Sequence, residues 1–93
     1  MKRAKGDAAI IQTVARNVRA KRKAVGLSQE ELAHEAGVDR TYVSQVERAL
    51  RNLTISVLAR IAKALRTSPD RLLIPGPGPA LKRASGSKRS PKA

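Results

Sequence analysis

The 93-residue sequence contains no cysteine, tryptophan or phenylalanine, and it has one histidine and one tyrosine. Without cysteine the chain forms neither disulfides nor thiolate zinc sites, and His34 alone offers too few nitrogen ligands for a metal centre. We therefore expect no metal and no cofactor. The sole aromatic residue, Tyr42, argues against single-stranded nucleic acid or RNA as the partner, because modules for those ligands stack bases on several aromatic rings.

The sequence also lacks long apolar runs and is poor in acidic residues. No run of about 18 apolar residues and no signal-peptide pattern is present, so we expect a cytoplasmic, nucleoid-associated protein without a membrane partner. The 20 lysines and arginines outnumber the 7 aspartates and glutamates, which gives a net charge of +13. A surplus of this size favours a polyanionic partner, and nucleic acid is the first candidate.

Apolar residues recur at helical spacing through residues 8–74, and capping residues and glycines divide this region into five predicted helices. The predicted helices run from about Ala8 to Val25, from the N-cap Ser28 to just before Gly37, from the N-cap Asp39 to about Arg48, from the N-cap Thr54 through Leu65, and from the N-cap Ser68 through Ile74. Ser28 and Glu31 have the spacing of a capping box, and Gly26 is the expected left-handed stop of the first helix. Residues 1–7 and 75–93 are basic and lack apolar periodicity, so both are expected to be disordered.

A three-residue turn separates the second and third predicted helices, and the residues around it recur at these separations in known DNA-binding proteins. They are Ser28-Gln29-Glu30-Glu31-Leu32-Ala33, Ala36-Gly37-Val38, Arg40-Thr41-Tyr42-Val43-Ser44, Glu47-Arg48, Arg51-Asn52 and Leu58 through Leu65. On these residues the segment from Leu27 to Leu65 resembles the lambda-repressor-like, or XRE, helix-turn-helix family of phage repressors and restriction-modification controller proteins. The resemblance implies an all-α, compact five-helix fold whose second and third helices form a helix-turn-helix.

The resemblance further implies that the third predicted helix is a recognition helix, whose first two turns face base edges in the major groove of double-stranded DNA. The candidate base-reading residues are Arg40, Thr41, Ser44 and Gln45. Arginine can bind guanine and glutamine can bind adenine through two hydrogen bonds each, and threonine can offer a methyl group to thymine. The alternative interpretation of these side chains is a polar face exposed to solvent.

Further residues are candidates for contacts with the DNA backbone, which orient a protein on the duplex. These are Gln29, Tyr42, Arg48, Arg51 and Asn52. Gln29 matches the family glutamine that binds phosphate at the start of the second helix, and the last three follow the recognition helix. Tyr42 either donates its hydroxyl to a phosphate or covers the gap between helices. Unpartnered surface charge is the alternative for the arginines.

Two further expectations concern the frame that holds the recognition helix. In the family an arginine of the first helix pairs with the glutamate that ends the recognition helix, and the matching residues here are Arg22 and Glu47. Such a pair would lock the recognition helix against the first helix. The sequence departs from the family at Ala49, where a glycine commonly adopts the left-handed conformation. Either Ala49 is strained or the third helix runs longer.

Together these patterns predict a homodimeric, sequence-specific regulator of transcription that reads a palindromic operator. Leu72, Leu73 and Ile74 are the predicted dimer interface, together with the end of the fourth helix, because three adjacent apolar residues cannot all face one small core. No arrangement of a nucleophile with a base is present, so an enzyme is not expected. RNA polymerase and a toxin are further candidate partners. The alternative functions are an antitoxin or coactivator-type protein-interaction module of the same fold, and an architectural DNA coater.

Overall fold

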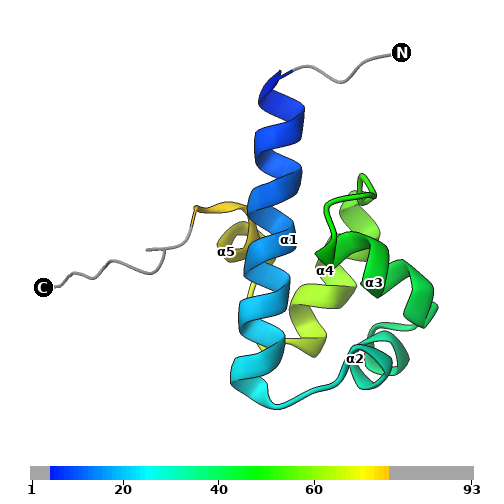
Figure 1. Cartoon of the computed structure of the whole chain (residues 1–93). Coiled ribbons are helices and arrows are strands. Elements are labelled where there is room, and N and C mark those ends of the chain that lie inside the picture. Colours follow the sequence, from blue (N-terminus) through cyan, green and yellow to red (C-terminus); the bar gives the residue numbers. More distant parts are fainter. Residues whose placement is uncertain (1–4, 76–93) are drawn as a thin grey trace, which may run out of the picture.

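The computed structural model describes residues 5–75, so the prediction for the tail, apart from Pro75, lies outside the described residues. Within this range the chain forms helices and no strand, which confirms the all-α prediction (Figure 1). The helices are α1 (Lys5–Val25), α2 (Gln29–Ala36), α3 (Arg40–Glu47), α4 (Ile55–Ala64) and α5 (Pro69–Leu73). None of these helices is both long and apolar enough to cross a bilayer.

Helix α1 begins earlier than the sequence indicates, at Lys5 instead of Ala8. The additional turn carries charge and Gly6 but no apolar periodicity, and extension of an existing helix needs no new nucleus. For this reason a pattern-based boundary misses it. Residues 5–7 of the predicted disordered arm are therefore helical, and residues 1–4 lie outside the described part of the chain.

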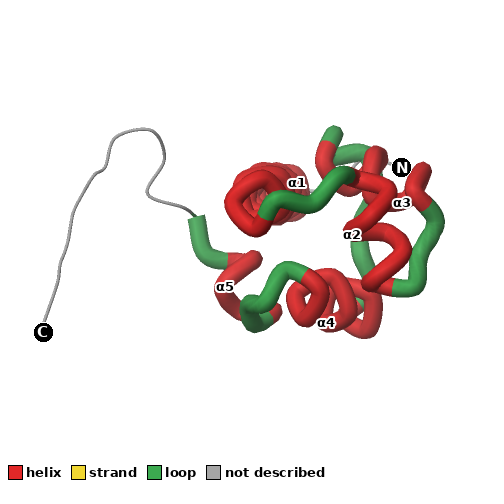
Figure 2. Tube along the Cα trace, turned by 90° about the horizontal axis from the view of Figure 1, so that it is seen from below, coloured by secondary structure: helices red, strands yellow, loops and turns green. Residues whose placement is uncertain are grey.

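The five helices pack in a closed ring in the order α1, α3, α2, α4, α5, with α5 returning to α1. The view in Figure 2 looks nearly along α1 and shows α2 and α3 on one side of the molecule and α5 on the other. Each helix contributes to the single core at the centre of the ring. The largest fully buried side chains are Val18, Leu32, Val43, Val46, Ile61 and Leu65.

The helix starts follow the predicted capping chemistry at three of four positions. The backbone N–H of Glu31 donates to Ser28 Oγ at 3.0 Å, and the N–H of Ser28 donates to the Glu31 carboxylate at 2.8 Å, which completes the capping box. Asp39 and Thr54 cap α3 and α4 by a single bond each, because their side-chain oxygens accept the N–H groups of Thr41 and Val57. At α5 the prediction is wrong in one respect, because the side chain of Ser68 makes no capping hydrogen bond.

The turn after α3 decides between the two alternatives for Ala49. Helix α3 ends at Glu47, and Ala49 adopts a left-handed φ of 60°. The N–H of Ala49 donates to the Val46 carbonyl at 3.0 Å and the N–H of Leu50 to the Gln45 carbonyl at 2.9 Å, as in a Schellman motif. Ala49 is therefore strained, at a cost of about 1–2 kcal/mol for a residue with a Cβ atom.

Helix α5 is fastened to α1 by a side chain that the sequence analysis did not single out. Asn17 Nδ2 donates to the backbone carbonyls of Leu72 at 2.9 Å and Ile74 at 2.7 Å. This anchoring turns Leu72 into the core, where it is 2% exposed, so its predicted place in a dimer interface is wrong. Leu73 and Ile74 remain 38% and 57% exposed.

Candidate nucleic-acid interface

Helix α3 has a buried apolar side and an outward polar side. Val43 and Val46 are buried against the core, whereas Arg40 and Thr41 in the first turn are exposed. Ser44 and Gln45, one turn later, are half-buried. The carboxylate of Asp39 accepts the N–H of Thr41 at 2.9 Å, and this hydrogen bond holds the pKa of Asp39 below its ordinary value. The four candidate base-reading residues therefore lie on the first two turns of α3, away from its apolar side.

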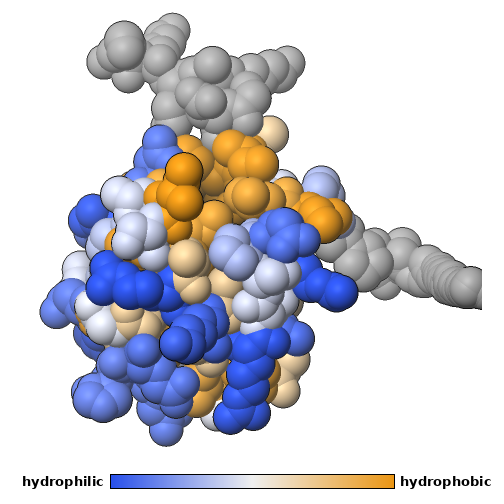
Figure 3. Space-filling view, turned by 180° about the vertical axis from the view of Figure 1, so that it is seen from behind, coloured by the Kyte–Doolittle hydropathy of each residue, from blue (hydrophilic) through white to orange (hydrophobic). Residues whose placement is uncertain are grey.

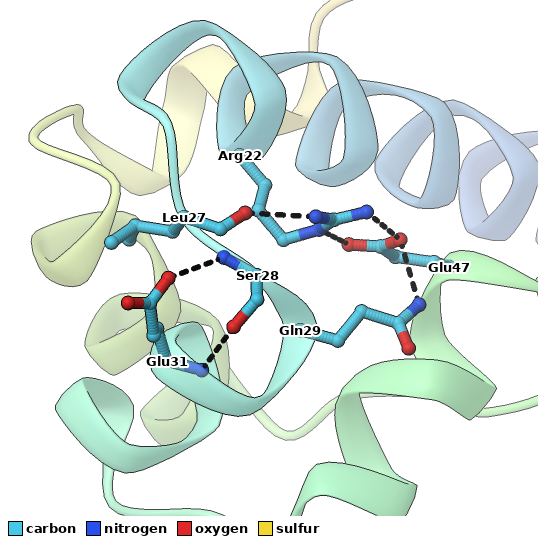
Figure 4. Close-up of polar contacts among 6 residues, drawn as sticks. All are labelled: Arg22, Leu27, Ser28, Gln29, Glu31 and Glu47. Carbon is cyan, nitrogen blue, oxygen red and sulfur yellow. Dashed lines mark hydrogen bonds and ion pairs between the residues drawn. The ribbon is translucent and has the colours of Figure 1, made fainter.

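A hydrogen-bonded ion pair connects the end of α3 to the rest of the fold (Figure 4). Arg22 Nε donates to Glu47 Oε2 at 2.6 Å, and Arg22 Nη2 donates to Oε1 at 3.1 Å. The third nitrogen, Nη1, donates to the carbonyl of Leu27 at 2.8 Å, in the turn that leads into α2. The Glu47 side chain is 2% exposed and that of Arg22 12%, so water screens the pair little. The predicted pairing of these residues is thus present and nearly enclosed.

Gln29, a predicted phosphate ligand, takes part in the same network. Its Nε2 donates to Glu47 Oε1 at 3.1 Å, so that α1, the start of α2 and the end of α3 meet at one carboxylate. Figure 4 shows the amide oxygen of Gln29 turned away from Glu47. Because an amide nitrogen carries two hydrogens, one N–H of Gln29 remains for another acceptor.

Arg51 lies in the loop after α3 and folds back onto the recognition helix. Its guanidinium carbon lies 4.4 Å from the centre of the Tyr42 ring, within the range of cation–π contacts. Its Nε donates to Gln45 Oε1 at 2.9 Å. Tyr42 is half-buried and Arg51 exposed. The structure therefore brings two predicted phosphate ligands together with a predicted base-reading residue.

Arg48 directly follows the end of α3 and lies beside α1, with which it lines a groove. Arg16 and Arg19 of α1 line this groove of about 360 Å³ with Arg48, and all three side chains are exposed. Glu47 also lines this groove, but its carboxylate is paired with Arg22. Within residues 8–75, whose side chains the structure describes, none of the three arginines forms an ion pair. Arg16 and Arg19 are not among the predicted site residues, although Arg16, Arg19 and Arg22 follow one another at intervals of three, which places neighbouring members on the same side of a helix.

Asn52, the last predicted phosphate ligand, is exposed beside a small apolar hollow of about 90 Å³. Ile10, Leu53 and Leu73 also line this hollow, which lies between α1, the loop after α3 and α5. Its apolar side chains distinguish it from the arginine-lined groove beside Arg48. Asn52 thus stands at the border between a polar and an apolar surface.

Comparison with known proteins identifies the arrangement of α2 and α3. Residues 18–72, more than half of the chain, match the helix-turn-helix family HTH_3. The chain belongs to this family. The match begins within α1 and ends within α5, so this helix-turn-helix domain includes nearly all of the described core. The resemblance that the motifs around residues 27–65 indicate is confirmed.

Three relatives illustrate what this helix-turn-helix protein is similar to. The control protein C.SmaI of Serratia marcescens is 50% identical over 64 residues, which are 69% of this chain and 76% of that protein. The crystal structure of a hypothetical transcription factor from Neisseria has a TM-score of 0.69 at 44% identity, over 71% of this chain and 76% of that one. The restriction-modification controller protein C.AhdI of Aeromonas hydrophila has a TM-score of 0.66 at 41% identity, over 69% of this chain and 97% of that one.

Proposed function

We propose that this helix-turn-helix protein is a sequence-specific regulator of transcription that places α3 in the major groove of double-stranded DNA, in the cytoplasm on the nucleoid. The observation that carries the proposal is the two-sided α3, with Val43 and Val46 buried and Arg40 and Thr41 exposed at its start. Entry of the first turns of a recognition helix into the groove is the docking geometry of the helix-turn-helix. The relatives named as control proteins and a transcription factor support the same role.

Backbone contacts on both sides of α3 would fix its register on the duplex. On the α2 side we assign the free N–H of Gln29 to a phosphate. On the α1 side Arg48 and the exposed Arg16 and Arg19 form a basic groove, in which Glu47 is paired with Arg22 and none of these three arginines has an ion-pair partner within residues 8–75. We assign this groove to the sugar-phosphate backbone that flanks the major groove, because it begins directly at the end of α3.

We further propose that the protein acts as a homodimer on a two-fold symmetric operator, with half-sites about one helical turn, roughly 10 bp, apart. Apolar side chains gather over one end of the molecule in Figure 3. Ile55, at the start of α4, is 86% exposed, and Ile10, Leu73 and Ile74 are 43%, 38% and 57% exposed. The proposed interface therefore uses the start of α4 in place of its end, together with α5 and the beginning of α1.

Dimerisation is tested by replacing the most exposed of these apolar residues. Ile55→Asp is expected to shift the protein from dimer to monomer in sedimentation velocity at tens of micromolar, because an aspartate would have to be buried without a partner. His34→Asp places the same residue on the exposed side of α2 and is expected to leave the dimer intact. A wild-type protein that sediments as a monomer with and without DNA would contradict the dimer.

Sequence specificity is tested by selection of bound duplexes from random DNA at about 0.15 M salt, where nonspecific attraction to phosphates is weakened. We expect the selected duplexes to be enriched in one two-fold symmetric motif. Recovery of DNA without any shared motif would contradict it and would favour a coating protein. Enrichment of a single asymmetric site would retain base reading but contradict the symmetric dimer.

A further inference from the structure

The contact between Arg51 and Gln45 fixes the chemistry that Gln45 presents to DNA. The guanidinium of arginine carries N–H donors and no acceptor, so the amide atom 2.9 Å from Arg51 Nε is the oxygen of Gln45. The amide nitrogen, with its two N–H donors, is the other end of the group. Arg51 thus decides which end of the Gln45 amide is already engaged.

Arg51 is itself held in place from two directions. Its guanidinium carbon lies 4.4 Å from the centre of the Tyr42 ring, so the two groups stack. Tyr42 belongs to α3 and precedes the buried Val46 by one helical turn. The loop backbone next to Arg51 is bound to Gln45 as well, because the N–H of Leu50 donates to the Gln45 carbonyl at 2.9 Å. The left-handed Ala49 makes this return of the chain possible. Strained residues of this kind occur where a site needs a particular backbone path.

We propose that Tyr42, Gln45 and Arg51 act as one donor-rich reading unit that selects guanine over adenine at one position of each half-site. This inference depends on the proposed placement of α3 in the major groove. There guanine presents two acceptors, N7 and O6, whereas adenine presents the acceptor N7 beside the donor N6 amino group. The two N–H groups of Gln45 and the guanidinium of Arg51 are donors, so they match the two acceptors of guanine. The amino group of adenine is also a donor, so it would face these N–H groups without forming a hydrogen bond. A free glutamine prefers adenine, so Arg51 reverses the preference expected of Gln45 alone.

Selection from random DNA with the wild type and with variants of Arg51 tests this unit. We expect the wild type to enrich guanine about tenfold over adenine at one position of the half-site, within the range of a good base contact. Arg51→Ala is expected to shift that position to adenine and leave the others unchanged. Arg51→Lys, which keeps the charge but lacks the Nε donor and the planar group, is expected to lose the guanine preference too.

Tyr42 and a distant arginine supply the controls. Tyr42→Phe keeps the ring under Arg51 and is expected to retain the guanine preference, while Tyr42→Ala is expected to reduce it. Arg60→Ala removes one positive charge from α4, where Arg60 borders Glu35 of α2, and is expected to leave every position unchanged. Because Arg51 is exposed, its variants are expected to melt within a few degrees of the wild type.

The outcomes separate this inference from the proposed function. A motif that stays the same in Arg51→Ala, with equally weakened binding to all sequences, would mean that Arg51 binds phosphate, and would overturn the inference alone. Adenine at the Gln45 position in the wild type would overturn it as well. A wild type that enriches no motif would overturn the proposed function and this inference together.

Discussion

Glu47→Gln is the substitution that most directly tests how the recognition helix is held. Glu47 accepts three hydrogen bonds, two from Arg22 and one from Gln29, and its side chain is 2% exposed. Glutamine has the same shape, but one of its two terminal atoms is a donor. That N–H₂ group must face a donor of Arg22 or Gln29, and the Arg22 guanidinium loses its only carboxylate partner among residues 8–75.

The expected magnitude follows from this burial. Removal of one member of a buried pair costs about 3–5 kcal/mol, because the other charge stays buried without compensation. Arg22 is 12% exposed and keeps its bond to the Leu27 carbonyl, so we expect the lower end, about 3 kcal/mol. For a domain of 60–100 residues this corresponds to a fall in Tm of about 12–24 °C. The loss of the link between α3 and α1 is expected to weaken DNA binding as well.

Thermal melting by circular dichroism and titration with the selected duplex below the new Tm measure the two effects. Glu35→Gln is the matched control, because Glu35 is exposed on α2 and should leave Tm unchanged within about 2 °C. The double variant Arg22→Met with Glu47→Met removes both charges and is expected to be more stable than either single methionine variant. A Glu47→Gln protein that melts with the wild type would refute the argument that this pair holds α3.

Three further perturbations test other parts of the account. Ala49→Gly is expected to raise the free energy of unfolding in urea by about 1 kcal/mol, because glycine adopts φ 60° without a Cβ clash, while Ala20→Gly in the right-handed α1 should lower it similarly. The hydrogen bond from Thr41 lowers the pKa of Asp39 below 3.8, so the ionised carboxylate stabilises the fold above that pH and stops doing so as the pH falls below it. The Tm difference between wild type and Asp39→Ala should therefore shrink as the pH falls below 3.8. Arg16→Gln with Arg19→Gln should reduce the slope of log K against log salt by about 1.8, at about 0.9 for each phosphate contact, without altering the selected motif.

The arginine variant has a control with the same change in charge. Arg60→Gln with Lys63→Gln removes two positive charges from α4 where it faces α2, on a surface that shares no residue with the groove beside Arg48. This control should change the slope by less than half as much, because distant charges form no contact with phosphate. Equal changes of slope in the two double variants would mean that net charge, and not the groove, determines the salt dependence.

Much of the fold could be predicted because its signals are local in the sequence. The capping box of Ser28 and Glu31 and the left-handed Gly26 depend on residues within one helical turn. The pairing of Arg22 with Glu47 spans 25 positions and came from the family resemblance, since no local pattern indicates it. Local chemistry predicts element boundaries, and the resemblance supplies contacts between elements.

What the sequence could not predict depends on tertiary contacts. Leu72, Leu73 and Ile74 are equally apolar, and the hydrogen bonds from Asn17 to the α5 backbone decide that Leu72 enters the core. The contact of Arg51 with Gln45 requires the tight turn at Ala49, where the usual glycine signal is missing. In both cases the missing information is the path of the backbone.

The most direct test of base reading by α3 is an NMR titration of the uniformly ¹⁵N-labelled protein with its selected duplex. The account predicts that the largest amide shift changes occur at residues 40–45 and at the start of α2, with smaller changes at Arg16 and Arg19. It also predicts that α4 residues around Arg60 stay unchanged. Large changes confined to α4 or to the acidic side of α2, with α3 unaffected, would contradict the claim that α3 enters the major groove.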